Sequence, residues 1–255
     1  MAGPTNAERE DPGAAPYGNF INYYSFNPPE NRLTLVPSDL LKEVGAEDGQ
    51  TTLVLDVGCN SGELTVALYR HLLGDDGASM GPREGQTLCL LGCDLDAALI
   101  DRAADSNPFP GAISFLPLDI TDQPACDTIL SSYLSRFNQG LFDLCTCLAV
   151  TMWVHLNHGD VGLLKMLSSL AVRCRYLLLE VQPWKCYQSA ARRLRKLGRR
   201  DFEHFKELQI RGDVEGRIRE YLEAECQMEL LHSFGSTSWK RNLLLFKSKR
   251  TTMTK

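Results

Sequence analysis

Three segments of the sequence place residues suited to nucleoside binding directly after apolar runs. Residues 56–62, Asp-Val-Gly-Cys-Asn-Ser-Gly, hold two glycines that let a backbone turn tightly against a ligand. Asp94 follows a second run, and its carboxylate can accept two hydrogen bonds from a ribose diol. Asp119 and Ile120 follow a third run. The Asp119 carboxylate could accept a hydrogen bond from an amino group, and the apolar side chain of Ile120 could pack on a ring. Each feature also has a structural interpretation: a tight strand–helix turn, or a helix cap, which suits Asp96 better than Asp94.

Two later segments carry further polar and aromatic groups. Residues 151–158, Thr-Met-Trp-Val-His-Leu-Asn-His, follow a fourth apolar run. His155 there could donate a hydrogen bond to an anion, act as a base, or be a packed or capping imidazole. His155 and His158 could pair on a metal, but no third ligand is apparent, and no Cys/His set has zinc spacing. Gln182-Pro183-Trp184 follows a fifth run and sets a polar group beside a large aromatic.

Basic residues concentrate in one stretch of an acidic chain. The formal net charge is −5, yet residues 185–200 hold seven basic residues and no acid, which leaves 20 − 32 = −12 for the rest. Four of them, Arg192, Arg195, Lys196 and Arg199, have the spacing of one helix face. The pattern indicates a surface for a polyanion such as RNA, with a merely solvated face as the alternative.

A repeated strand-then-helix rhythm positions these groups. Continuous apolar runs at 51–57, 88–94, 113–119, 141–150 and 175–181 alternate with helical patterns at 63–73, 97–106, 126–137, 161–172 and 185–197. Such alternation predicts an α/β fold, a mostly parallel sheet with helices on both faces. Runs at 228–235 and 241–248 predict a closing antiparallel pair, giving seven strands. Ligands of such sheets bind at the carboxyl ends of the strands.

Composition and length limit the remaining possibilities. The chain has 255 residues, 44% of them hydrophobic, and no apolar run long enough to span a membrane. Its nine cysteines are odd in number and sit in apolar runs, which predicts buried free thiols in a reducing compartment. We expect a disordered segment at 1–15, an ordered aromatic arm at 16–50, a domain at 51–248 and a tail at 249–255. The arm's aromatics are either anchors on the core or a lid over a ligand.

The glycine turn, Asp94 and Asp119, in that order, resemble class I S-adenosylmethionine-dependent methyltransferases, a Rossmann-like fold. A narrower resemblance covers residues 16–248. Its motifs are Tyr17-Gly18-Asn19-Phe20 with Tyr23 and Arg32, Gly58-Cys59-Asn60, Thr151 to Asn157, and Gln182-Pro183-Trp184. Together these motifs are similar to the bicoid-interacting-protein-three family of RNA 5′-phosphate methyltransferases.

The resemblance implies a role for each matched residue. S-adenosylmethionine would be the cofactor, held by Tyr23, Arg32, Gly58, Asn60, Gly62, Asp94, Asp119, Ile120 and Leu148. Catalysis would involve His155 and Tyr23, and RNA would contact Tyr17, Trp184, Arg192, Arg195, Lys196 and Arg199. The arm would then serve as a lid.

The implied substrate is the 5′-monophosphate of small RNAs, histidine tRNA and microRNA precursors. Met152 stands where the family member that acts on a triphosphate end has lysine, which favours a less charged end. We expect a cytoplasmic monomer without a structural metal or membrane attachment. Two alternatives remain: a non-catalytic RNA-binding module on a methyltransferase fold, and a small-molecule methyltransferase.

Overall fold

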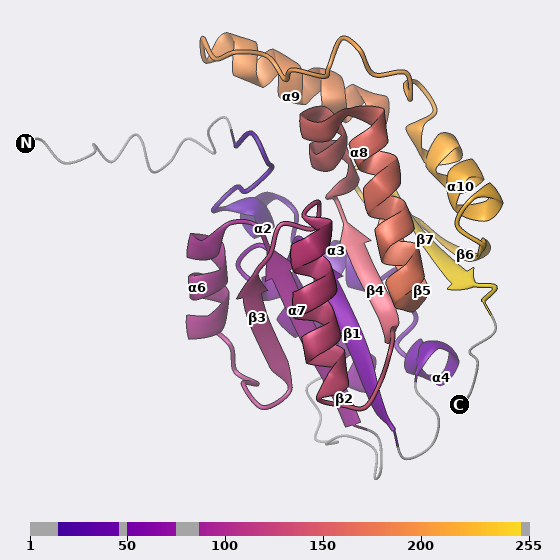
Figure 1. The fold of residues 1–255 in the computed structure, drawn as a ribbon. Helices are drawn as coiled ribbons and strands as arrows, with labels where there is room; N and C mark the ends of the chain where they lie inside the picture. The colour runs from indigo at the N-terminus through magenta and orange to yellow at the C-terminus, as the bar shows by residue number, and fades with distance from the viewer. Residues whose placement is uncertain (1–14, 46–49, 75–86, 251–255) are drawn as a thin grey trace, which may run out of the picture.

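One seven-stranded sheet with helices on both faces forms the body of the protein (Figure 1). The structure is a computed structural model that describes residues 15–45, 50–74 and 87–250. The strands run in the order β3-β2-β1-β4-β5-β7-β6, with β1 to β5 parallel and β7 antiparallel to both its neighbours. The strand order reverses between β1 and β4, which is where this architecture binds ligands.

The strands are β1 (Thr51–Val57), β2 (Thr87–Asp94), β3 (Ile113–Pro117), β4 (Phe142–Leu148), β5 (Cys174–Glu180), β6 (Met228–Ser236) and β7 (Asn242–Ser248). The helices are α2 (Tyr23–Phe26), α3 (Glu30–Leu33), α4 (Leu41–Val44), α5 (Glu63–Leu73), α6 (Ala97–Asp105), α7 (Gln123–Ser135), α8 (Thr151–Arg173), α9 (Trp184–Lys196) and α10 (Val214–Ala224). The predicted fold class, with its terminal antiparallel pair, is confirmed.

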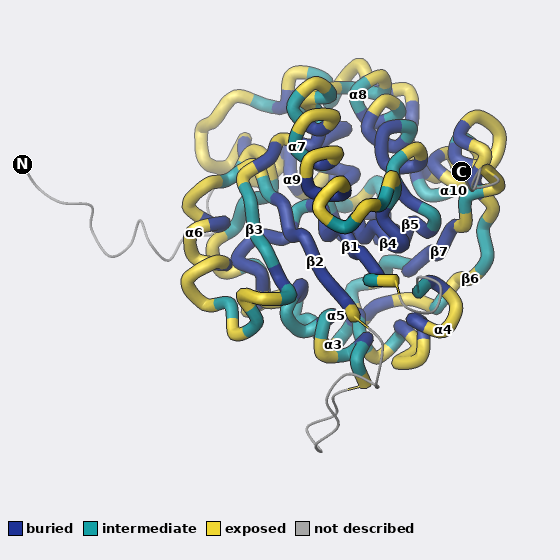
Figure 2. The backbone as a smooth tube through the Cα atoms, turned by 60° about the horizontal axis from the view of Figure 1, so that its bottom comes forward, coloured by how far each residue is buried: buried dark blue, intermediate teal, exposed yellow. Residues whose placement is uncertain are grey.

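The central strands are buried on both faces, which explains their continuous apolar sequences. In β1, Leu53 and Leu55 pack into the cluster formed with α7, α8 and α10, whereas Val54 packs into the cluster formed with α4 and α5. Figure 2 shows the central strands as buried chain, whereas the edge strands β3 and β6 and the outer sides of the helices are partly exposed. The two cores fix the sheet, and the sheet in turn fixes the loops at its edge.

Two details differ from the sequence-based expectations, and the arm, expected only to be ordered, contains three short helices, α2 to α4. Residues 151–158 are helical: α8 begins at Thr151 and kinks at Gly159 (φ 67°, ψ −174°). The basic helix α9 ends at Lys196, so Arg199 lies beyond it. The expectations for residues 1–14 and 251–255 lie outside the described residues.

All nine cysteines are free, and eight of them are buried, as predicted. Over the described ranges, no helix is long and apolar enough to cross a bilayer. Within those same ranges no cluster of three or more His, Cys, Asp or Glu side chains is placed to hold a metal ion.

Candidate active site

A cavity of about 230 Å³ lies at the carboxyl ends of the central strands. Its walls come from the ends of β1 to β4, from the N-terminal arm and from the start of α8. Residues on its wall include Tyr17, Asn19, Tyr23, Tyr24, Asp56, Gly58, Asn60, Asp94, Leu118, Asp119, Ile120, Leu148, Val150, Trp153 and His158. The parallel sheet therefore gathers segments that are far apart in the sequence around one space.

The turn after β1 approaches the cavity without side chains in the way. Gly58 has φ +73°, and a Cβ there would lie 2.3 Å from the Val150 side chain, so only glycine fits. The backbone N–H groups of Gly58 and Cys59 both donate to the carbonyl of Cys93, at 2.8 and 3.0 Å. Gly62 is not part of the cavity wall; a Cβ there would meet the Phe115 ring at 2.7 Å. Its role is to let α5 start close to the sheet.

Asp94 faces the cavity with both carboxylate oxygens already oriented. Oδ2 accepts from the backbone N–H of Asn60 and Oδ1 from that of Asp96, each at 3.0 Å. Each oxygen keeps one further lone pair, so the group can accept from two neighbouring hydroxyls of a diol. Burial raises the pKa of Asp94, the two backbone hydrogen bonds opposing that shift. Asp96 instead caps α6, as its sequence position suggested.

The opposite part of the wall suits a flat apolar ring. Leu118, Ile120 and Leu148 are buried and line the cavity. Asp119 is exposed at the rim, where its Oδ1 accepts from the N–H and hydroxyl groups of Thr121, at 2.8 and 2.7 Å. An amino group on such a ring would find a carboxylate within the same wall.

The arm forms part of the cavity wall and is held there by specific contacts. Asn60 Nδ2 donates to the carbonyl of Phe20 at 3.1 Å, and the Phe20 ring meets Trp153 edge-on at a centroid distance of 5.8 Å. The Tyr24 hydroxyl donates to the carbonyl of Cys59 at 3.1 Å. Tyr24 and Trp153 were not among the predicted site residues; Trp153 lay within a quoted motif, whereas nothing distinguished Tyr24 from an anchor.

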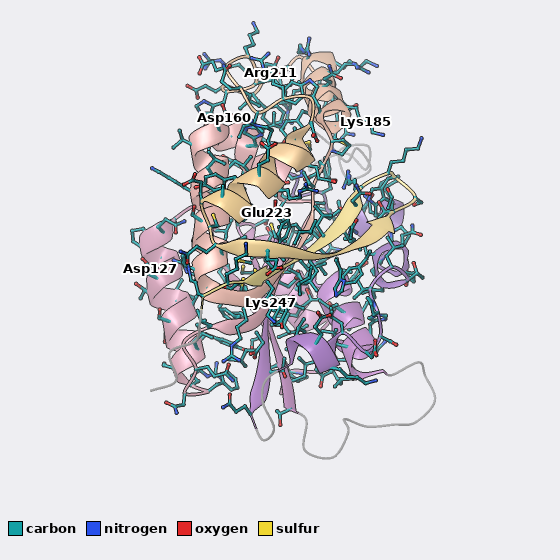
Figure 3. All side chains as sticks on the ribbon, turned by 90° about the vertical axis from the view of Figure 1, so that its right-hand side faces the viewer. Asp127, Asp160, Lys185, Arg211, Glu223 and Lys247 are labelled. Atoms are coloured by element: carbon teal, nitrogen blue, oxygen red, sulfur yellow. The ribbon has the colours of Figure 1, made fainter. Side chains whose placement is uncertain are left out.

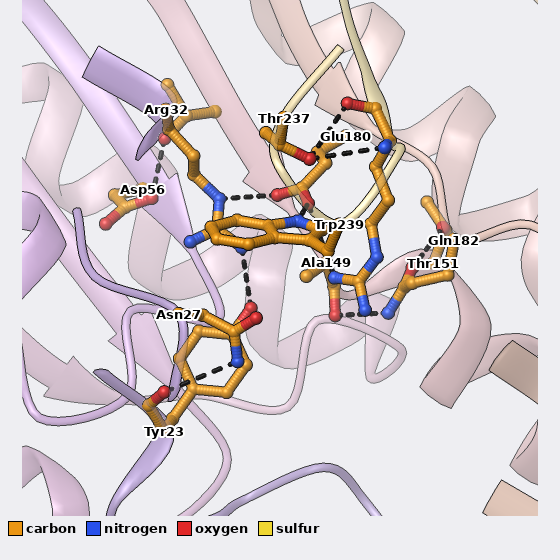
Figure 4. A network of polar contacts seen from close by, with 12 residues as sticks. Tyr23, Asn27, Arg32, Asp56, Ala149, Thr151, Glu180, Gln182, Thr237 and Trp239 are labelled. Carbon is orange, nitrogen blue, oxygen red and sulfur yellow. Dashed lines mark hydrogen bonds and ion pairs between the residues drawn. The ribbon is translucent and has the colours of Figure 1, made fainter. Parts of the chain in front are cut away.

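Arg32 stands next to the cavity rather than on its wall. Its Nε donates to Glu180 Oε2 at 2.5 Å, and Nη2 donates to the hydroxyl of Tyr23 at 2.6 Å; of these three residues only Tyr23 lines the cavity. Figure 4 shows this network, in which Trp239 also donates to Glu180. Arg32 was predicted to line the cofactor site; its guanidinium holds Tyr23, and contact with a ligand is left to its Nη1.

Two buried polar atoms near the cavity have no hydrogen-bond partner among the described residues. They are Nη1 of Arg32, a cationic donor, and Oδ1 of Asn19, an acceptor. Asn19 is held by Asp96, to which its Nδ2 donates at 2.8 Å. Buried polar atoms are rarely left unpaired, so a donor and an acceptor here match a ligand that carries both a carboxylate and an amino group.

Comparison with known proteins identifies the family of this chain. Residues 142–248 match the family model described as Bicoid-interacting protein 3 (Bin3). The chain is 61% identical over 243 residues to a pre-miRNA 5′-monophosphate methyltransferase of Danio rerio, covering 94% of this chain and 95% of the relative. This chain belongs to the Bin3 family. A second relative, the pre-miRNA 5′-monophosphate methyltransferase of Xenopus laevis, is 52% identical over 256 residues, covering 98% of this chain and 99% of the relative.

A solved structure confirms the fold of this Bin3 member as that of class I methyltransferases. The N-methyltransferase NodS from Bradyrhizobium japonicum WM9, in complex with S-adenosyl-L-homocysteine, superposes with a TM-score of 0.53. The match has 16% sequence identity and covers 89% of this chain and 91% of NodS. At that identity the likeness concerns the fold.

His155 does not reach the cavity of this Bin3 chain, which corrects the prediction that it acts on the substrate. Its side chain is fully buried, with Nδ1 hydrogen-bonded to the Tyr187 hydroxyl at 3.0 Å and Nε2 to Asp160 Oδ1 at 2.7 Å. Burial lowers the pKa of His155, against the opposing effect of Asp160. The imidazole therefore ties α8 to α9. His158, one turn later, is the histidine on the cavity wall.

Met152 and Trp184 are also placed differently from expectation. Met152 is buried in the core, with its N–H donating to Gln182 Oε1 at 3.2 Å, so its side chain is not on the wall. Trp184 stacks on Phe205 at 5.6 Å and on Tyr187 at 5.0 Å, which commits its ring to packing rather than to RNA. The sequence around Trp184 shows only an aromatic residue beside polar groups. It does not reveal the stacking, because the partner rings belong to other segments of the chain.

The basic residues of α9 lie at the cavity end of the molecule. Figure 1 shows α9 across the end toward which β4 points, and Figure 3 shows Lys185 and Arg211 at that same end. Arg192 and Lys196 are exposed, and Arg195 pairs with Asp201 at 3.5 Å. Arg193, absent from the predicted face, lies over the Phe20 ring at 5.3 Å and so approaches the arm beside the cavity.

Proposed function

We propose that this chain is an S-adenosylmethionine-dependent methyltransferase that methylates the 5′-monophosphate of small RNAs, with histidine tRNA and microRNA precursors as substrates. The observation that carries the proposal is the cavity at the β1/β4 switch point, with the Asp94 carboxylate on its wall. The 61% identity to a relative named as a pre-miRNA 5′-monophosphate methyltransferase supports the same reaction.

The residues present fit this cofactor along its length. Asp94 would accept hydrogen bonds from the ribose diol, and Ile120 and Leu148 would pack on the adenine. The unpaired Asn19 Oδ1 and Arg32 Nη1 would take the amino and carboxylate groups of the methionine end. When bound, the cofactor supplies an electrophilic methyl group on a sulfonium.

The chemistry asks the protein mainly for alignment. A phosphate monoester carries a charge of about −1.5 to −2 at pH 7, so one of its oxygens can attack without a general base. This agrees with the burial of His155. That oxygen forms a bond to the methyl carbon as the carbon–sulfur bond breaks, its electron pair going to sulfur. Correct positioning contributes up to roughly 7–11 kcal/mol to such a step.

The arm and Tyr23 would provide that positioning. The Phe20–Trp153 contact and the Tyr24 hydrogen bond hold the arm over the strand ends, which excludes water from the methyl group. Tyr23 lines the cavity with its hydroxyl fixed by Arg32, so we place it beside the reacting groups. Tyr17, 46% exposed on the wall, would meet the first nucleotide of the RNA.

The exposed cations of α9 and of the residues after it would bind the RNA backbone. Arg192, Arg195, Lys196 and Arg199 form this track in the proposal, joined by Arg193 beside Phe20. The proposed organisation is one methyltransferase domain over 51–248 with a lid at 16–50. In this proposal the protein is a monomer located in the reducing cytoplasm, and its nine unpaired cysteines support that location.

The test separates the enzyme from its two rivals. Calorimetric titration with S-adenosylmethionine should show binding, whereas a non-catalytic RNA module would show none. Labelled methyl transfer should then occur to a 5′-monophosphate RNA and not to the same RNA treated with phosphatase. Binding without any transfer to RNA would contradict the proposal and favour a small-molecule acceptor.

A further inference from the structure

The described Asp, Glu, Lys, Arg and His side chains on the cavity wall are three carboxylates and one histidine. Asp56, Asp94 and Asp119 all line the cavity. Of the described residues on this wall, His158 is the only one whose side chain can carry a positive charge. The Arg32 guanidinium does not line the cavity and is paired with Glu180 and Tyr23. A phosphate that enters this cavity therefore meets a single ionisable partner of favourable sign.

His158 is placed to serve as that partner. It is the last residue of the first helical segment of α8, directly before the kink at Gly159, and it is exposed. The carbonyl end of a helical segment favours a cation. The neighbouring Asn157 Nδ2 donates to the carbonyl of Pro16 at 2.9 Å, which brings the arm and Tyr17 to the same side of the cavity.

The two histidines of this helix differ in what remains available to a ligand. Both ring nitrogens of His155 are hydrogen-bonded within the protein. His158 has no hydrogen bond or ion pair with any other described residue. Its ring N–H is therefore available at the cavity, and an imidazole keeps at least one N–H donor in either protonation state.

We propose, building on the function proposed above, that His158 binds the acceptor phosphate and sets the preference for a single phosphate at the RNA end. Its N–H donates to one non-attacking phosphate oxygen and leaves the attacking oxygen free. One such donor among three carboxylates matches one phosphate group, whereas two additional phosphates would bring charge that nothing on the wall compensates.

Binding of one RNA with two different ends tests this directly. The full chain, loaded with S-adenosyl-L-homocysteine, is titrated by fluorescence anisotropy against an oligonucleotide carrying a 5′-phosphate or a 5′-hydroxyl. The wild type should prefer the phosphate by about tenfold or more, the value of one hydrogen bond to a charged group. His158→Ala and His158→Phe should lose this preference, and His158→Gln, which keeps a donor, should retain part of it. His232→Ala, a half-exposed histidine on β6, is the matched control and should retain all of it.

The outcomes separate this inference from the proposed function. Equal affinity of the wild type for both ends, or an undiminished preference in a folded His158→Ala chain, would overturn the role of His158. Affinity for S-adenosyl-L-homocysteine reports folding, and His158→Phe, which keeps the ring volume, decides the question if His158→Ala does not fold. Failure of the wild type to methylate any 5′-monophosphate RNA would instead overturn the proposed function. The preference for a 5′-phosphate over a 5′-hydroxyl in the binding assay would still test the role of His158.

Discussion

Asp94 is the residue on which cofactor binding should depend most. Each of its oxygens accepts one backbone N–H at 3.0 Å and keeps one lone pair for a ribose hydroxyl. Hydrogen bonds to a charged group contribute roughly 1.5–3 kcal/mol each, so Asp94→Ala removes about 3–6 kcal/mol. Burial raises the pKa of Asp94 and gives its carboxylate a desolvation cost that alanine lacks. The net loss is therefore smaller, and we expect cofactor affinity to fall by about tenfold or more.

Calorimetry with S-adenosylmethionine measures this loss. Asp122→Ala is the matched control, because Asp122 caps α7 through Ala125 N–H and does not line the cavity. It should cost about 1 kcal/mol of stability and leave the affinity unchanged. The wild-type affinity should also fall as the pH is lowered into the raised pKa of Asp94, since a protonated carboxyl accepts the diol poorly, and Asp94→Ala should lack that dependence. A folded Asp94→Ala chain with wild-type affinity would refute the assignment.

Three further outcomes are expected. Replacing Arg192 and Arg195 by glutamate should weaken RNA binding and flatten the log-affinity versus log-salt slope by roughly 0.7–0.9 per lost phosphate contact, with cofactor affinity unchanged; an unaltered slope in a salt titration would exclude α9 as the track. Turnover on one RNA with three different ends should follow the order monophosphate, triphosphate, hydroxyl, and equal rates on the first two would contradict it. Burial lowers the pKa of His155, so its contribution to the free energy of unfolding is complete above the unfolded value of about 6.5 and declines as the pH falls. Urea titrations should show this decline in the wild type and a weaker one in His155→Phe, whereas parallel pH profiles would count against it.

The fold and the strand-end part of the site could be predicted from the sequence because both depend on local patterns. Continuous apolar runs identified the parallel strands, and parallel strands bring their carboxyl ends together. Gly58, Asp94, Asp119 and Ile120 consequently meet at one cavity, as their positions indicated.

The remaining parts of the site depend on contacts that no local pattern reveals. Arg32 pairs with Glu180, 148 residues away, and with Tyr23, so only its Nη1 remains for the ligand contact that the sequence predicted. The imidazole of His155 is hydrogen-bonded to Asp160 and Tyr187, and α8 kinks at Gly159, directly after His158. These contacts and the kink decide which of the two histidines faces the cavity. A strand-end loop and a first helical turn have similar compositions, so the spacing of the two histidines does not decide which one faces the cavity.

The position of the transferred methyl group tests the central claim most directly. A small RNA with a 5′-monophosphate is incubated with the protein and S-adenosylmethionine, digested to nucleotides and analysed by mass spectrometry. We predict methylation on the 5′-terminal phosphate alone, and no methylated product from RNA whose end phosphate was removed beforehand. Methylation that persists on the phosphatase-treated RNA, or that maps to a base or a ribose, would contradict O-methylation of the phosphate.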